Sequence, residues 1–213
     1  MYIEFAVPAI TAYANGFADY WTRSPFIKAP SDRYAINALT TTYVRLVEAA
    51  LVGYRAGTAA LKEFWGTGAT FKLGAMNRSV SHFEACISDM LRATNCFRRL
   101  RGDSQHDPLS LALRADKAAF ATDTVWDRIR TMRNEVHHLD EMIVEENIVA
   151  GQVFALVAGG PETVHPTEPN QTIKTIDRLV IGEQEILFTE LATWLEEMAA
   201  FAGKIAGQLP SSR

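Results

Sequence analysis

Hydrophobic side chains recur along most of the chain at the three- and four-residue spacing of amphipathic helices. The clearest run alternates steps of four and three through the positions Met76, Val80, Phe83, Ile87, Met90, Thr94 and Phe97. This spacing predicts a helix with one buried face. Arg98, Arg99 and Arg101 follow the run, where positive charge suits the negative end of a helix dipole and also fits an RNA contact.

A second long helix is predicted over 31–65. Ser31 or Asp32 can cap its first turn, and the sequence Gly-Thr-Gly at 66–68 ends it. Within this helix Gly53 and Gly57 each cost about 1 kcal/mol relative to alanine. Glycines retained at that cost indicate either close packing by a neighbour or a local bend.

Two more helices are predicted in the second half of the chain. One covers 123–146, with Thr122 or Asp123 as its cap and an apolar stripe of Val125, Ile129, Met132, Val136, Leu139 and Ile143. The other covers 184–208, with Leu187, Leu191, Trp194, Leu195, Met198, Phe201 and Ile205 facing inward.

Between these two helices the pattern changes to one typical of strands. The segments 152–158 and 172–181 are rich in β-forming residues and flank a turn-rich loop, which predicts a small β-hairpin inserted at 150–182. The segment 102–121 has no clear pattern. No linker or repeat divides the chain, so residues 1–213 are interpreted as one domain. The predicted fold is mainly α, an up-and-down helical bundle with a β-hairpin inserted before the C-terminal helix.

Composition and charge narrow the class of protein. The chain is 48% hydrophobic and 22% charged, within the globular range. Its formal net charge of -4 gives the molecule as a whole no electrostatic attraction to duplex DNA. A local basic patch would still be able to bind nucleic acid.

The chain is predicted to be cytoplasmic, with no membrane partner. No stretch approaches the roughly 20 apolar residues that cross a bilayer, and the first ten residues lack the basic region of a signal peptide. Cys86 and Cys96 fall in one predicted helix, where ten residues at ~1.5 Å each separate them by ~15 Å. A disulfide between them is therefore excluded, which suits a reducing compartment.

The chemically most suggestive residues are Arg133-Asn134-Glu135-Val136-His137-His138. On a helical wheel His137 lies ~40° from Arg133 and His138 lies ~140° from it. An imidazole can take a proton from a hydroxyl, and a guanidinium can hold a phosphate with two hydrogen bonds. These groups suffice for metal-free RNA cleavage by the 2′-hydroxyl, although ordinary residues of a solvated helix face have the same spacing.

This motif, on a long helix of a small helical bundle, resembles the RNxxxH signature of the HEPN superfamily (higher eukaryotes and prokaryotes nucleotide-binding). The matching residues are Arg133, Asn134 and His138. The resemblance implies a metal-independent endoribonuclease of the toxin or antiviral-defence kind. It implies Arg133 and His138 as the catalytic pair with Asn134 in support, and no cofactor. It also implies RNA as substrate and a homodimer in which two motifs form a composite site, with an antitoxin or nucleotidyltransferase as a possible partner.

Two further residues belong to this hypothesis, and two features of the chain differ from the family pattern. Arg130 and Glu141 lie beside His137 on the wheel of the predicted helix, and we assign Arg130 and His137 to substrate binding. The motif is followed by Leu139 and no tyrosine occurs in 127–149, so the tyrosine modification of some toxin–antitoxin HEPN pairs is not expected. The predicted hairpin at 150–182 is an addition to the minimal fold.

Two alternatives remain open at this point. Glu135 and His138 form an ExxH pair of the kind that ligates di-iron in helical bundles, but none of the other predicted helices carries a second ExxH to face it. The other alternative is a non-catalytic HEPN-like protein that binds a partner protein or a nucleotide.

Overall fold

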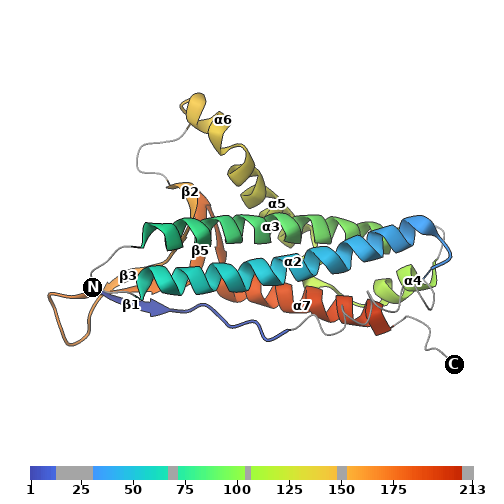
Figure 1. Ribbon diagram of the computed structural model, residues 1–213, viewed down its shortest axis with the longest axis horizontal. Helices are drawn as coiled ribbons and strands as arrows, with labels where there is room; N and C mark the ends of the chain where they lie inside the picture. Colours follow the sequence, from blue (N-terminus) through green and yellow to red (C-terminus); the bar gives the residue numbers. More distant parts are fainter. Residues whose placement is uncertain (13–30, 67–71, 104–106, 148–152, 208–213) are drawn as a thin grey trace.

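Two long antiparallel helices form the body of the molecule, α2 (Tyr34–Trp65) and α3 (Leu73–Arg101), and α7 (Phe188–Gly207) packs along α2 (Figure 1). The computed structural model of the protein describes residues 1–12, 31–66, 72–103, 107–147 and 153–207. Helices make up most of this part of the chain, and small β-sheets lie at one end of it. The prediction of a mainly helical protein is therefore confirmed.

Glycines in the middle of α2 set its close contact with α3. A Cβ on Gly57 would lie 2.9 Å from Cε1 of Phe83, and one on Gly53 would lie 3.1 Å from the carbonyl oxygen of His82. Both distances are shorter than ordinary van der Waals contacts. Of the two explanations that the sequence left open for these glycines, close packing by a neighbour is the one the structure bears out.

The start of α2 differs from the prediction. Its N-cap residue is Arg33, and neither Ser31 nor Asp32 takes that position. Ser31 Oγ accepts a hydrogen bond from the Arg33 backbone N–H (3.0 Å) and donates one to Asp107 Oδ2 (2.5 Å). Asp107 caps α4 (Pro108–Ala115), which begins in the segment without a clear pattern and is followed by the short 3-10 helix η1 (Ala119–Ala121). Ser31 thus links the N-terminus of α2 to that of α4, and the local sequence around Ser31 does not predict this contact.

The helix predicted over 123–146 is in fact two helices. Thr122 caps α5 (Asp123–His137), as predicted, and α6 (Leu139–Val144) follows after a break at His138, whose φ is -102° and ψ 12°. The apolar stripe explains the break, because it meets the core only in α5. Ile129 and Met132 are buried, whereas no residue of α6 is buried.

Two three-stranded sheets replace the single hairpin predicted at 150–182, of which 150–152 lie outside the described residues. One sheet has the order β2 (Val153–Gly159), β5 (Arg178–Gly182), β6 (Gln184–Leu187), all antiparallel. The other has the order β1 (Tyr2–Phe5), β4 (Thr172–Ile176), β3 (Glu162–Val164), with β1 parallel to β4.

The predicted strand 172–181 is therefore divided between the two sheets at Asp177. The Asp177 backbone donates to the Gly159 carbonyl (3.0 Å) and accepts from the Phe188 N–H (2.8 Å). Because β6 occupies 184–187, α7 begins at Phe188 and not at 184 as predicted. The single hairpin was a wrong prediction because β4 pairs with β1, which lies at the other end of the chain.

The core lies where α2, α3 and α7 meet, with the sheet of β2, β5 and β6 at one end. Phe97 is fully buried at the centre of an aromatic cluster, with its ring centroid 5.5 Å from Tyr43 and 4.9 Å from both Phe120 and Phe201. The predicted inward face of the last helix is confirmed from Leu191 to Ile205. One hydrophobic cluster includes residues from all three long helices.

Candidate functional site

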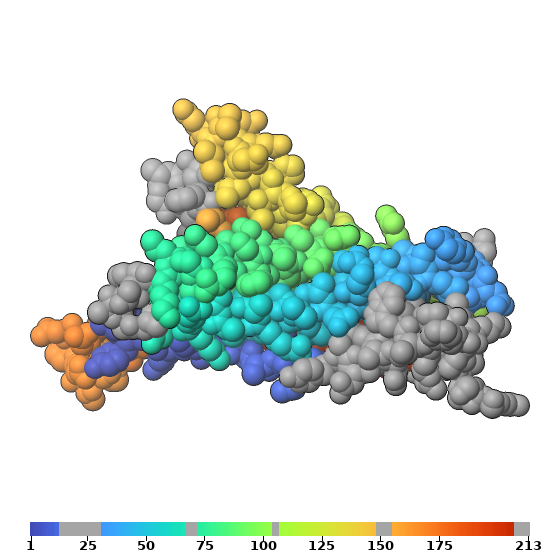
Figure 2. Space-filling model, viewed as in Figure 1, coloured from blue at the N-terminus to red at the C-terminus, as the bar shows by residue number. Residues whose placement is uncertain are grey.

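The motif residues lie on an arm made of α5 and α6. The base of this arm packs against α3, β5 and β6, and its far end stands clear of the long helices (Figures 1 and 2). Two features fix the base. Ile129 and Met132 are buried in the core, and Arg128 donates hydrogen bonds of 2.7 and 2.9 Å to the two carboxylate oxygens of Glu190 on α7. Hydrogen bonds from the Arg128 side chain lower the pKa of Glu190.

A row of four side chains follows one face of α5. Trp126, Arg130, Arg133 and His137 are spaced by four, three and four residues, which places them on one helical face. Arg130 and His137 are exposed, and Trp126 and Arg133 are half-buried. The sequence identified the last three of these residues, and the structure brings them onto one surface with the tryptophan.

Trp126 is held firmly in this row. Its Nε1 donates a hydrogen bond to Asn95 Oδ1 on α3 (2.8 Å), and the guanidinium carbons of Arg98 and Arg130 lie 4.8 and 5.1 Å from its ring centroid. Arg98 also pairs with Asp123, at 2.6 Å, so its charge joins the end of α3 to the start of α5. Sequence reasoning missed Trp126, although its spacing of four from Arg130 was the signal that would have found it.

His138 has a carboxylate partner. Its Nδ1 lies 2.8 Å from Oε2 of Glu141, and both side chains are more than half exposed, at 54% and 66%. The wheel of a continuous helix had placed Glu141 beside His137. The contact that the structure records for Glu141 is with the neighbouring histidine, His138, which lies at the break between α5 and α6.

The remaining motif residues form a second small group. Arg133 Nη1 donates a hydrogen bond to Asn134 Oδ1 (3.3 Å). Within the described part of one chain no hydrogen bond joins this pair to the pair of His138 and Glu141. A single chain therefore presents a cation with an amide, and an imidazole with a carboxylate, as two groups on one arm.

The other candidate residues in the described part of the chain are less suited to catalysis or to metal binding. Cys86 and Cys96 are free thiols, as predicted, and burial raises the pKa of each. Over the described ranges no three His, Cys, Asp or Glu residues are grouped closely enough to hold a metal ion. None of the helices described is long and apolar enough to span a bilayer.

Comparisons with known proteins identify no similar protein. No protein-family profile, curated protein or solved structure matches the chain.

Proposed function

We propose that this protein is a HEPN-like, metal-independent endoribonuclease that uses Arg133 and His138. The observation that carries the proposal is the contact of 2.8 Å between His138 Nδ1 and Glu141 on an exposed arm. An ionised carboxylate only accepts hydrogen bonds, so the neutral imidazole keeps its proton on Nδ1 and presents the lone pair of Nε2. That is the arrangement of a general base oriented by a carboxylate.

The reaction follows from these groups. His138 Nε2 takes the proton of an RNA 2′-hydroxyl, the 2′-oxygen attacks the adjacent phosphorus, and the bond from phosphorus to the 5′-oxygen breaks. An imidazolium returns a proton to the leaving 5′-oxygen. Arg133, oriented by its hydrogen bond to Asn134, stabilises the negative charge that develops on the phosphoryl oxygens. The products are a 2′,3′-cyclic phosphate and a free 5′-hydroxyl.

The row along α5 supplies a path for the RNA strand. Arg130 and His137 are exposed beside Arg133, so they can contact consecutive phosphates. Trp126 and the guanidinium groups beside it offer flat surfaces of the kind on which unpaired bases stack. A single strand fits this row better than a duplex, because only unpaired bases expose their faces.

A second copy of the chain would complete the site. On α6, Ile143 is 52% exposed and Val144 is 82% exposed, so apolar side chains stand in solvent directly after the motif. In a homodimer that covers them, His138 of one chain would lie across the interface from Arg133 of the other. The exposed arm also fits a partner protein, which is the alternative of a non-catalytic HEPN-like protein bound to an antitoxin or nucleotidyltransferase.

Cleavage is expected to survive chelation. In a gel assay with single-stranded RNA and EDTA, we expect fragments that end in 2′,3′-cyclic phosphates, because the proposed base and cation need no metal. A matched DNA strand should stay intact, and one 2′-deoxy nucleotide should block cleavage at its own position only. Loss of activity in EDTA, or equal cleavage of DNA, would refute the mechanism. Growth arrest on expression, relieved by His138→Ala, would support a role as a toxin or defence effector.

A homodimer is expected at micromolar concentration in light scattering. The substitution Ile143→Asp should produce a monomer with little ribonuclease activity, because it places a charge in an interface that would bury about 2,000 Å² or more in total. Leu111→Asp is the matched control, since Leu111 is 46% exposed on α4, away from the arm. A wild-type protein that is monomeric and inactive would instead favour the partner-binding alternative.

A further inference from the structure

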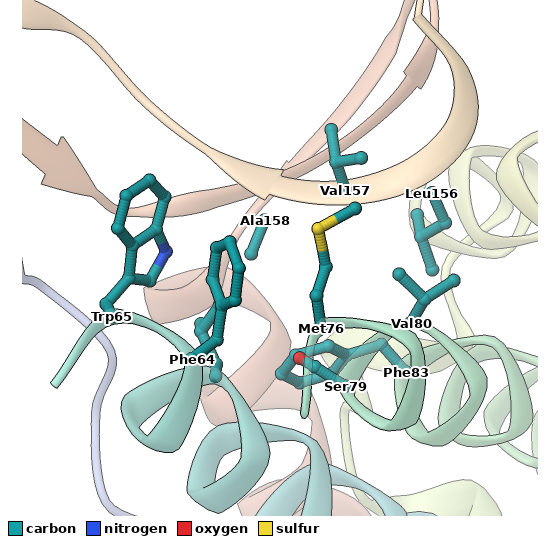
Figure 3. A pocket seen from close by; sticks show the side chains of 10 residues that line it. Phe64, Trp65, Met76, Ser79, Val80, Phe83, Leu156, Val157 and Ala158 are labelled. Carbon is teal, nitrogen blue, oxygen red and sulfur yellow. The ribbon is translucent and has the colours of Figure 1, made fainter. Parts of the chain in front are cut away.

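A cavity lies outside the α5 row, where the end of α2 and the start of α3 meet strand β2 (Figure 3). Its volume is about 230 Å³. Phe64 and Trp65 from α2, Met76 and Val80 from α3 and Ala158 from β2 line it. None of the lining residues is charged. A molecule in this cavity would exchange water for an almost wholly apolar surface.

One polar group in the lining lacks a partner. The indole Nε1 of Trp65 is buried and makes no hydrogen bond within the described residues. Figure 3 shows this nitrogen on the side of the ring that faces Phe64 and the interior of the cavity. The other polar side chain, Ser79, already donates to the Gly57 carbonyl (3.0 Å). Because a buried donor without an acceptor costs free energy, the Trp65 N–H calls for an acceptor that the described part of the protein does not supply.

Water is a poor candidate for that acceptor. An ordered buried water typically makes two to four hydrogen bonds, whereas the lining offers it one free donor among apolar side chains. Apolar cavities of about 150 Å³ stay dry and accept benzene, so a larger one has room for a somewhat larger ring system. The flexible side chain of Met76 can adapt to its shape.

We propose that this cavity binds a small, uncharged, mostly apolar molecule with one hydrogen-bond acceptor, a carbonyl or ether oxygen, which accepts from Trp65 Nε1. The apolar wall supplies the affinity and the indole N–H selects the oxygen. Charged analogues are excluded because no lining group compensates their desolvation.

Two probes of one shape test the proposal by calorimetry. 2-Acetylnaphthalene carries a carbonyl oxygen, and 2-isopropylnaphthalene has a similar shape without an acceptor. We expect the wild-type protein to bind the ketone more tightly than the hydrocarbon. The substitution Trp65→Phe removes the N–H and keeps most of the apolar surface, so it should lower the affinity for the ketone by ~3- to 10-fold and leave that for the hydrocarbon nearly unchanged.

Three further variants serve as controls for the binding measurement. Ala158→Phe and Val80→Phe each place a ring in the cavity, so whichever of them folds by circular dichroism should bind neither probe. Trp194→Phe, in the core beside Arg128, should leave both affinities unchanged. No binding to the wild type, equal affinities for the two probes, or an undiminished affinity of Trp65→Phe for the ketone would overturn the proposal. None of these outcomes depends on ribonuclease activity, so this inference and the proposed function stand or fall separately.

Discussion

The substitution His138→Ala is expected to lower the rate of RNA cleavage at least ~100-fold, the usual lower end for loss of a general acid or base. The reason is the oriented imidazole, whose Nδ1 lies 2.8 Å from Glu141 and whose Nε2 is then free to take the proton of the 2′-hydroxyl. Single-turnover cleavage of a labelled RNA strand measures this rate without a contribution from product release. Arg133→Ala should cause a loss of similar size, because the developing phosphoryl charge then lacks its cation.

Other substitutions separate a catalytic role from a structural one. Glu141→Gln removes the charge but keeps the size of the side chain, so its rate should lie between those of His138→Ala and the wild type. His137→Ala should weaken RNA binding and cost less in the chemical step, because His137 lies on the binding row of α5 beside Arg133. His82→Ala, on α3 and outside the motif, is the matched histidine control and should retain full activity.

The assignment of the two histidines is open to direct contradiction. A His137→Ala protein that is inactive while His138→Ala cleaves at nearly the wild-type rate, both folded by circular dichroism, would show that the motif is assigned to the wrong residue. The likeness to HEPN nucleases would then lose its main support.

The substitution Phe97→Ala is expected to lower the free energy of unfolding by about 3–5 kcal/mol. Phe97 is fully buried, and its ring lies 4.9 Å from those of both Phe120 and Phe201, so its loss would leave a cavity between α3, η1 and α7. Because domains are typically stable by about 5–15 kcal/mol, this is a large share of the total. Urea unfolding followed by circular dichroism measures the change.

A matched aromatic control accompanies this measurement. Tyr34, in the first turn of α2, is 87% exposed, so Tyr34→Ala should change the free energy of unfolding by no more than about 0.5 kcal/mol. A Phe97→Ala protein as stable as Tyr34→Ala would mean that the aromatic cluster is not packed as the structure shows.

Local patterns in the sequence were enough to find the long helices. The apolar period through Phe83, Ile87 and Met90 identified the buried face of α3, and Gly53 and Gly57 indicated a place in α2 where either a neighbour comes close or the helix bends. Both signals arise from residues near one another in the chain, because a helix repeats every 3.6 residues and glycine lacks a Cβ that would hold a neighbour away.

What only the tertiary structure decided depends on residues far apart in the chain. Strand β1 pairs with β4, Ser31 bonds to Asp107, and Asn95 fixes Trp126, and none of these pairings has a local sequence signature. The candidate site shows the same limit. The sequence identified Arg133 and His138, but it did not show that the helix breaks at His138, beyond which the apolar stripe no longer has a core to cover.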